Sequence, residues 1–364
     1  MTAIVPATDA GLALAATALR EGRPVVIPTE TVYGLAADAT SPDAVASVFA
    51  AKSRPSDDPL IVHVAPGLLP RPRVEGLVTL GVVAEDLEPA QRATADALVD
   101  AFWPGPLTLV LPRGPAIPLA VTSRLESVAI RMPAHPVARA VIEAAGRPLV
   151  APSANLFGRI SPTTAEAAQS ELEGRIGLVV DGGRCDVGVE STVVRVDADG
   201  GLGLLRPGAV TRVDLERVAG TSPYDVQAAE GIAGSPGRLL RHYAPSTPLV
   251  IVGTGPSGWQ EPRWADLRRR LAQGTGRLGY IAWSSPSEAI RIALGGASTD
   301  LHVRTLAPDG TVAEAAHSLY AVLRELDELK ADLLVVERPP GGGGLADAVA
   351  DRLGRAAHGT PPLA

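Results

Sequence analysis

Two short polar segments near the start of the chain contain the residue types best suited to chemistry. The first, residues 28–35 (Pro-Thr-Glu-Thr-Val-Tyr-Gly-Leu), follows an apolar run over 24–27 that predicts a buried strand. Pro28 ends that strand, because proline donates no hydrogen bond to a ladder. Open α/β sheets bind ligands at the carboxyl ends of their strands. The second segment, residues 52–55 (Lys-Ser-Arg-Pro), adds two cations after a predicted helix. Hydroxyls facing such cations favour a small substrate with amino-acid and phosphate groups.

Further polar residues follow other predicted strands or open the elements after them. Loops at strand ends can converge on one cleft, so these side chains are candidates for a common site. Arg offers a bidentate fork, Lys a point charge and the hydroxyls neutral donors, a combination that suits a phosphate chain. The candidates are His63, Arg131, Ser153, Asn155, Ser161, Glu190, Ser191 and Arg206.

Most of these residues have a structural alternative when each is considered alone. The hydroxyls of residues 29–31 could serve turn chemistry, and Lys52 with Arg54 could form a solvated helix end. His63 could be a satisfied core histidine. Arg131 differs, because an Arg directly after the apolar residues 128–130 is part-buried and needs an anion.

Other motifs carry no chemistry by this reasoning. Cys185, the single cysteine, has no neighbouring histidine, which indicates an inert thiol. The glycine tract 341–344 lacks a following Lys-Ser/Thr, so it predicts a turn before a helix and not a phosphate-binding loop. No His, Cys and Asp spacing indicates a metal site built by the protein.

Composition narrows the class of protein. The 364 residues are 46% hydrophobic, with 3% aromatics and a net charge of −7. An acidic chain with few aromatics is unsuited to gripping a nucleic acid as its main ligand. One cysteine allows no internal disulfide, and neither a signal peptide nor a membrane helix is indicated. We therefore expect a cytoplasmic protein without membrane attachment.

The pattern of elements predicts an α/β protein with two domains. Residues 1–218 mix crossovers with a hairpin, which predicts a twisted mixed sheet with helices. Residues 219–248 are rich in Gly, Pro and Ser and predict a linker. Residues 249–364 alternate strands and helices, which predicts a smaller, Rossmann-like parallel sheet. Predicted helices are 8–22, 42–51, 91–103, 136–146, 163–174, 264–273, 311–330 and 345–357. Predicted strands are 24–27, 60–64, 107–111, 128–131, 148–151, 177–180, 191–196, 203–205, 249–253, 278–283, 301–306 and 332–337.

The motifs, taken in order, resemble a known family. Eight of them span residues 28–208: those at 28–35, at 52–63 (with Lys52, Arg54 and His63), at 103–108 (Trp-Pro-Gly-Pro-Leu-Thr), at 131–133, at 153–155, at 161–163, at 190–192 and at 206–208. Their order is similar to that of the YrdC family, the L-threonylcarbamoyladenylate synthases. The segment 235–245 and the second α/β domain resemble the long, two-domain form of that family.

The resemblance implies a nucleotidyltransferase. It would join L-threonine, bicarbonate or CO2 and ATP, with Mg2+ on the triphosphate, and release pyrophosphate. The product, threonylcarbamoyl-AMP, would pass to a separate transferase that modifies tRNA next to the anticodon. Such chemistry needs two charged substrates held in line more than covalent help from the protein.

The resemblance also implies roles for individual residues. Thr31, His63, Arg131, Ala151 (through its backbone) and Ser191 would hold L-threonine. Lys52 and Arg54 would be the catalytic cations. They would line the ATP side with Asp58, Ser127, Ser153, Asn155, Ser161 and Arg206, and His242 and Tyr243 of the linker would close over the nucleotide as a lid.

The sequence departs from the family pattern in three respects. Asp58 stands where the family often has Asn, Arg238 and Leu240 replace a Met and a Tyr in the linker, and residues 156–160 are bulkier than usual. Two other functions compete with the synthase. One is an RNA-binding module, which the acidic charge disfavours. The other is a carbamoyl-adenylate enzyme of hydrogenase maturation, whose zinc-finger cysteines this chain lacks.

Overall fold

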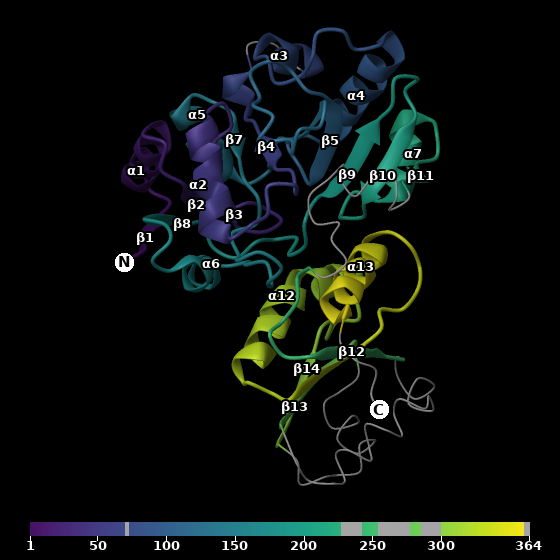
Figure 1. Cartoon of the computed structure of the whole chain (residues 1–364). Helices are drawn as coiled ribbons and strands as arrows, with labels where there is room; N and C mark the ends of the chain where they lie inside the picture. Colours follow the sequence, from purple (N-terminus) through teal and green to yellow (C-terminus); the bar gives the residue numbers. More distant parts are fainter. Residues whose placement is uncertain (70–72, 227–241, 254–276, 285–299, 360–364) are drawn as a thin grey trace. The chain divides into compact units, whose positions relative to one another are not determined.

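The chain divides into two compact units, each described here by itself. The computed structural model describes residues 1–69, 73–226, 242–253, 277–284 and 300–359. The N-terminal unit is Met1–Phe157 with Ser161–Arg238, and the C-terminal unit is Gly158–Ile160 with Leu239–Ala364 (Figure 1). The predicted helix 264–273, the linker residues 227–241 and the two linker departures, Arg238 and Leu240, lie outside the described residues.

A single mixed sheet of eleven strands organises the N-terminal unit, as the sequence predicts. β1 and β8 pair in parallel, whereas β9 and β10 form the predicted antiparallel hairpin. The strands lie in the order β1 (Ala3–Pro6), β8 (Leu178–Asp181), β2 (Val25–Ile27), β3 (Gly34–Asp38), β7 (Leu149–Val150), β4 (Ile61–His63), β6 (Ser127–Arg131), β5 (Leu107–Pro112), β9 (Thr192–Val196), β10 (Leu202–Arg206) and β11 (Tyr224–Asp225).

The predicted helices of this unit are confirmed, and their ends follow from local chemistry. Ser41 caps α2 by accepting a hydrogen bond from the Ala44 amide, and Pro42 occupies the first turn, where its missing N–H costs nothing. Thr8 caps α1 in the same way. The helices are α1 (Asp9–Arg20), α2 (Pro42–Lys52), α3 (Arg73–Thr79), α4 (Pro89–Phe102), α5 (Pro136–Ala145), α6 (Ala165–Leu172) and α7 (Arg212–Ala219), with a short 3-10 helix, η1 (Pro66–Leu68).

Six described elements of this unit are absent from the sequence prediction: β1, β3, β11, α3, α7 and the short 3-10 helix η1. Strand β3 reads Gly-Leu-Ala-Ala-Asp, a composition with weak strand propensity, yet it is buried between β2 and β7. Helix α7 does carry a local signal. Thr211 and Asp214 form a capping box at its start, in which each side chain accepts a hydrogen bond from the other residue's backbone amide.

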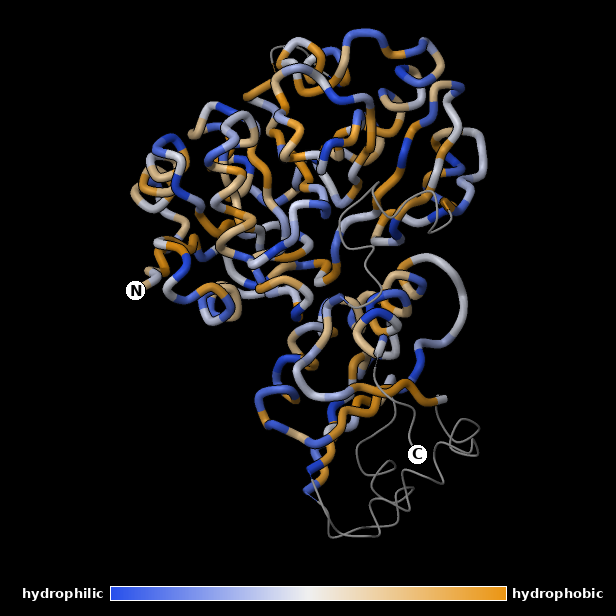
Figure 2. Tube along the Cα trace, viewed as in Figure 1, coloured by the Kyte–Doolittle hydropathy of each residue, from blue (hydrophilic) through white to orange (hydrophobic). Residues whose placement is uncertain are grey.

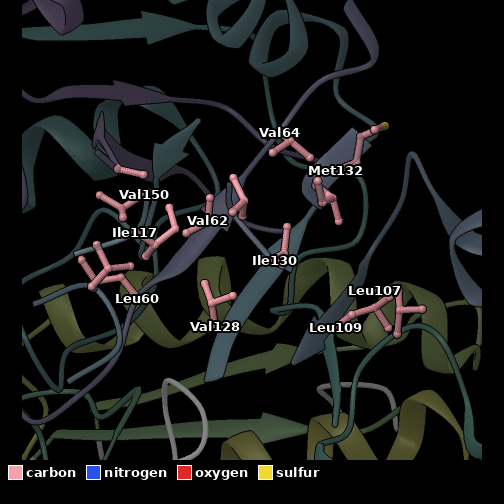
Figure 3. Packing of buried hydrophobic residues seen from close by; sticks show 14 of the residues in the cluster. Leu60, Val62, Val64, Leu107, Leu109, Ile117, Val128, Ile130, Met132 and Val150 are labelled. Carbon is pink, nitrogen blue, oxygen red and sulfur yellow. The ribbon is translucent and has the colours of Figure 1, made fainter. Parts of the chain in front are cut away.

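Strict alternation along the central strands divides the sheet between core and site. Val62 of β4, Ile130 of β6 and Leu109 of β5 are fully buried in the main hydrophobic cluster (Figure 3). Many of the hydrophobic residues lie along the strands (Figure 2). Because successive side chains of a strand point to opposite faces, the residues next to Val62, Ile130 and Leu109 along their own strands belong to the other face of the sheet.

The C-terminal unit contains an all-parallel sheet, again as predicted. Its strands lie in the order β12 (Leu249–Val252), β15 (Leu333–Glu337), β13 (Arg277–Ala282) and β14 (Asp300–Thr305). The predicted helices 311–330 and 345–357 are α12 (Val312–Glu328) and α13 (Leu345–Ala357). The glycine tract 341–344 leads into α13, as expected for a turn before a helix.

The core of the N-terminal unit predicts a clear stability contrast. Leu109→Ala should lower the free energy of unfolding by about 2–5 kcal/mol, because it removes a fully buried side chain and leaves a cavity. Leu14→Ala is the matched control, since Leu14 is 56% exposed and its loss should cost under about 0.5 kcal/mol. Urea unfolding followed by circular dichroism measures both. Equal effects of the two substitutions would contradict this assignment of the core.

Candidate active site

Four polar residues lie on the face of the sheet opposite the main core. His63 of β4 pairs in register with Arg131 of β6, and Arg131 pairs with Thr108 of β5. Residues directly opposite one another in a sheet share a face, so these three side chains form a row across adjacent strands. Ser191 precedes β9 by one residue and has the same parity as Val193, the register partner of Thr108. We call the face of the sheet that carries these four side chains the site face.

A buried ion pair fixes the centre of the row. Glu30 Oε1 lies 2.6 Å from Arg131 Nη2, and both side chains are almost completely buried. Arg131 also donates to Thr31 Oγ1 at 2.8 Å and to the Gly105 carbonyl at 3.2 Å. Burial raises the pKa of the Glu30 carboxyl, but the Arg131 guanidinium and a backbone hydrogen bond from Ala134 lower it by more, so the net pKa falls below its ordinary value. Glu30 is therefore a carboxylate near neutral pH.

His63 is neutral and has one defined tautomer. Burial, and then the nearby Arg131 cation, lower its pKa to about 3. Nδ1 lies 3.1 Å from the Ile61 carbonyl, which can only accept, so Nδ1 carries the proton. Nε2 is thus an acceptor, and His63 can receive a hydrogen bond from a substrate hydroxyl or amine.

Ser191 connects this row to Arg206, the last residue of β10. Thr108 Oγ1 and Ser191 Oγ are 2.7 Å apart. Arg206 donates to the Ser191 carbonyl at 3.1 Å through Nε and to Ser191 Oγ at 3.2 Å through Nη2. All three residues are buried. The structure therefore brings together two residues that the sequence assigned to different substrates.

Lys52 ends helix α2 and is buried, with its ammonium held by backbone oxygens. Nζ donates to the carbonyls of Ser153 and Asn155, the residues expected beside it on the nucleotide side. Burial, and then the Arg54 charge, lower the pKa of Lys52 well below its ordinary value. An anion next to the amine would oppose both effects, so binding of a phosphate would favour the charged form.

Asp58, the unusual residue of the second motif, is paired with Arg54. Its Oδ2 lies 2.9 Å from Arg54 Nη2, and both side chains are buried. Arg54 also donates to the carbonyls of Asp58 and Pro59 at 3.1 and 2.8 Å. The carboxylate thereby fixes the guanidinium and neutralises it, where the Asn common in the family would only hydrogen-bond.

The remaining expected residues are placed as follows. Ser161 donates to Glu190 Oε1 at 2.7 Å, and Asn155 Nδ2 donates to the Leu156 carbonyl at 2.7 Å. The Ala151 amide donates to the Ile61 carbonyl at 3.1 Å, so only its carbonyl oxygen is left for a ligand.

Three expected residues remain to be placed. Ser127 begins β6 and Arg131 ends it, about 13 Å away at the usual rise per residue. His242 and Tyr243 belong to the C-terminal unit. There, Tyr243 packs with Tyr320 at a ring distance of 5.9 Å and under the Arg352 guanidinium at 5.5 Å.

Three residues of the site were not assigned a role from the sequence. Glu30 and Glu190 were noted only as polar neighbours, and Thr108 only as part of a motif. Each had a usable signal. Thr108 interrupts an otherwise apolar strand, and each Glu directly precedes a residue given a substrate role. A buried hydroxyl or carboxylate in such a place needs a partner.

Comparisons with known proteins show which family the chain resembles. The family model named for Sua5, YciO and YrdC, described as "Telomere recombination", matches residues 17–208. "Threonylcarbamoyl-AMP synthase, C-terminal domain" matches residues 210–358. Threonylcarbamoyl-AMP synthase of Bacillus subtilis (strain 168) is 41% identical, covering 96% of this chain and 94% of its own. That of Pyrococcus abyssi (strain GE5 / Orsay) is 36% identical, covering 94% and 93%.

A solved structure extends the likeness to three dimensions. The crystal structure of P. abyssi Sua5 complexed with L-threonine matches 98% of both chains, with a TM-score of 0.83 and 35% identity. The chain belongs to the threonylcarbamoyl-AMP synthase family. Its enzyme class is that of a nucleotidyltransferase, and its two α/β units are those of the two-domain form of the family.

Two further observations describe this synthase homologue. Within the described residues, no group of three His, Cys, Asp or Glu side chains could hold a metal ion. In the same part of the chain, no helix combines the length and apolar character needed to cross a membrane.

The neutral His63 predicts a specific pH dependence of stability. Its folded pKa of about 3 lies below the unfolded value near 6.5, so the unfolded state binds an extra proton between these values. Stability should therefore fall as pH drops from 6.5 toward 3. His63→Gln should make that slope shallower by up to ~1.4 kcal/mol per pH unit. Urea unfolding of both proteins from pH 4.5 to 7.5 measures the difference, and identical slopes would contradict a buried neutral His63.

Proposed function

We propose that this protein makes L-threonylcarbamoyl-AMP from L-threonine, bicarbonate or CO2, and ATP. The threonine amine is first converted to a carbamate. A carbamate oxygen then attacks the α-phosphorus of ATP, and pyrophosphate leaves. The observation that carries the proposal is a buried arginine beside a neutral histidine, in the same unit as three further buried cations, Lys52, Arg54 and Arg206.

The row on the site face suits an amino acid. Arg131 has five N–H groups and gives three contacts to Gly105, Thr31 and Glu30, so N–H groups remain for the substrate carboxylate. His63 Nε2 can accept from the substrate hydroxyl or amine. Because Glu30 already balances Arg131, the row is near neutral and matches a zwitterion such as threonine.

The second group of cations suits the triphosphate. Lys52 and Arg54, the proposed catalytic cations, are held by backbone carbonyls and by Asp58, so they need little reorganisation when charge develops on the leaving pyrophosphate. We assign Ser153, Asn155, Ser161 and Arg206 to this side as further polar contacts, and Ser127, His242 and Tyr243 complete the proposed set. This arrangement supports positioning and charge neutralisation as the source of the rate.

The nucleotide would bring its own metal ion. Asp58, the carboxylate next to the cations, is paired with Arg54, and no cluster of metal-binding side chains exists among the described residues. The donor set therefore fits Mg2+ that arrives on the triphosphate as part of the substrate. The product would be consumed by a separate transferase that modifies tRNA beside the anticodon.

The first test is the substrate requirement of the reaction. The purified protein should release pyrophosphate from ATP only when both threonine and bicarbonate are present, and mass spectrometry should detect threonylcarbamoyl-AMP. A CO2-depleted buffer and replacement of threonine by valine, which lacks the hydroxyl, serve as controls. Pyrophosphate release that does not depend on threonine would refute the proposal.

The second test removes the proposed carboxylate fork. Arg131→Met alone would strand a buried Glu30 charge at a cost of about 3–5 kcal/mol, so it is combined with Glu30→Gln. The double variant should fold and should raise the KM for threonine by about 30-fold or more, as expected for a lost charged contact. Thermal denaturation of the double variant is the folding control, because Glu30→Gln alone would in turn strand the Arg131 charge. An unchanged KM in the double variant would exclude Arg131 from the amino-acid site.

A further inference from the structure

We propose that Thr108 is a positioning residue that fixes the hydroxyl of Ser191 as a hydrogen-bond donor to the bound amino acid. The inference rests on the proposed function, because that function supplies the amino acid. Thr108 is fully buried in β5, and Ser191 is almost fully buried beside β9. Both lie on the site face next to Arg131.

The first step concerns the hydrogen of Thr108. Among the described residues, the hydrogen-bond partner of Thr108 Oγ1 is Ser191 Oγ, at 2.7 Å. A hydroxyl carries one hydrogen, and leaving it without an acceptor in a fully buried place costs about 1–3 kcal/mol. Ser191 Oγ is the acceptor at hand. Whichever hydroxyl donates to the other, one of the two hydrogens lacks an acceptor among the described residues. When a substrate atom accepts from Ser191, both hydrogens have acceptors only if Thr108 donates and Ser191 accepts, so this is the direction in the complex.

The second step concerns the two lone pairs of Ser191. Arg206 Nη2 donates to the same oxygen at 3.2 Å, and its Nε holds the Ser191 carbonyl at 3.1 Å. Two donors, Thr108 and Arg206, thus occupy both acceptor positions of the hydroxyl. The hydrogen of Ser191 has no acceptor within the described part of the chain, although the residue is only 1% exposed.

The third step identifies what this hydrogen meets. Ser191 lies on the face that carries Arg131, whose guanidinium attracts a carboxylate. An oxygen of the amino-acid substrate would give the Ser191 hydrogen its missing acceptor. Two donors into one hydroxyl also polarise it and strengthen its own donation. Thr108 thus acts through Ser191 and makes no contact with the substrate in this arrangement.

The test is a double-mutant cycle on threonine binding, measured by isothermal titration calorimetry without turnover. Thr108→Val keeps the shape but removes the hydroxyl, and it should weaken threonine binding by about three- to tenfold, the share of one hydrogen bond. Thr108→Ser keeps the donor and should restore binding to within about twofold. In a Ser191→Ala background, Thr108→Val should have no further effect, because the group through which it acts is gone.

Two controls separate this role from a structural one. Thr2→Val also removes a buried threonine hydroxyl, one that donates to the Ile176 carbonyl at 2.8 Å, and should leave threonine affinity unchanged. Thermal denaturation reports the folding of every variant. If Thr108→Val fails to fold, Thr108→Ala, which is smaller, replaces it in the cycle.

The outcomes distinguish the inference from the reaction it assumes. Wild-type affinity in Thr108→Val, or effects that add in the Ser191→Ala background, would overturn the role of Thr108. The calorimetry needs only threonine, so a failure of the proposed ATP chemistry would appear in the pyrophosphate assay and leave this result standing. A wild-type protein that does not bind threonine would overturn the inference together with the proposed amino-acid site.

Discussion

The buried pair of Glu30 and Arg131 is the contact on which the site depends. Arg131 ends β6, whose neighbours β4 and β5 supply His63 and Thr108. A guanidinium at 3% exposure is tolerable only with an anion and hydrogen bonds around it, and Glu30 reaches it from the loop after β2. This one contact therefore joins the polar loop to the central strands. Burial lowers the pKa of His63 most, and the neighbouring Arg131 cation lowers it further.

Arg54 and Asp58 form a second buried ion pair of the same kind. Arg54 is balanced by Asp58 just as Arg131 is balanced by Glu30, and all four side chains are buried. Holding a cation in place before the ligand arrives means that little energy is spent on ordering it later. Lys52 differs, because backbone carbonyls hold it and a depressed pKa makes it responsive to an anion. An anion bound beside Lys52 would favour the charged form of its amine.

The sequence predicts the elements well where periodicity is local. The apolar stripe over 311–330 and the proline at the start of α2 each determine a helix without help from distant residues. Strand β3 shows the limit. Its glycine and alanines have little strand propensity, and its structure depends on pairing with β2 and β7, the latter more than a hundred residues away in sequence.

The same limit applies to the site. Motif order predicts a set of site residues, but not what each one contacts. Asp58 had no assigned partner until the fold placed it 2.9 Å from Arg54, four residues away. The link from Thr108 to Ser191 spans 83 residues and depends on the register between β5 and β9. A single sequence without registers cannot supply such a contact.

The mix of balanced ion pairs and hydroxyls suits a substrate whose charge changes during the reaction. In the proposed chemistry, threonine begins as a zwitterion, and its amine becomes an anionic carbamate before attack on ATP. A fixed, unbalanced cation beside the amine would oppose binding of the ammonium form, and a fixed carboxylate would oppose the carbamate. At the β4 end the row offers instead the neutral imidazole of His63, whose Nε2 accepts a hydrogen bond without carrying charge. Neutral polar groups at the changing atom, with charges kept to the unchanging ends, let one rigid site serve both steps.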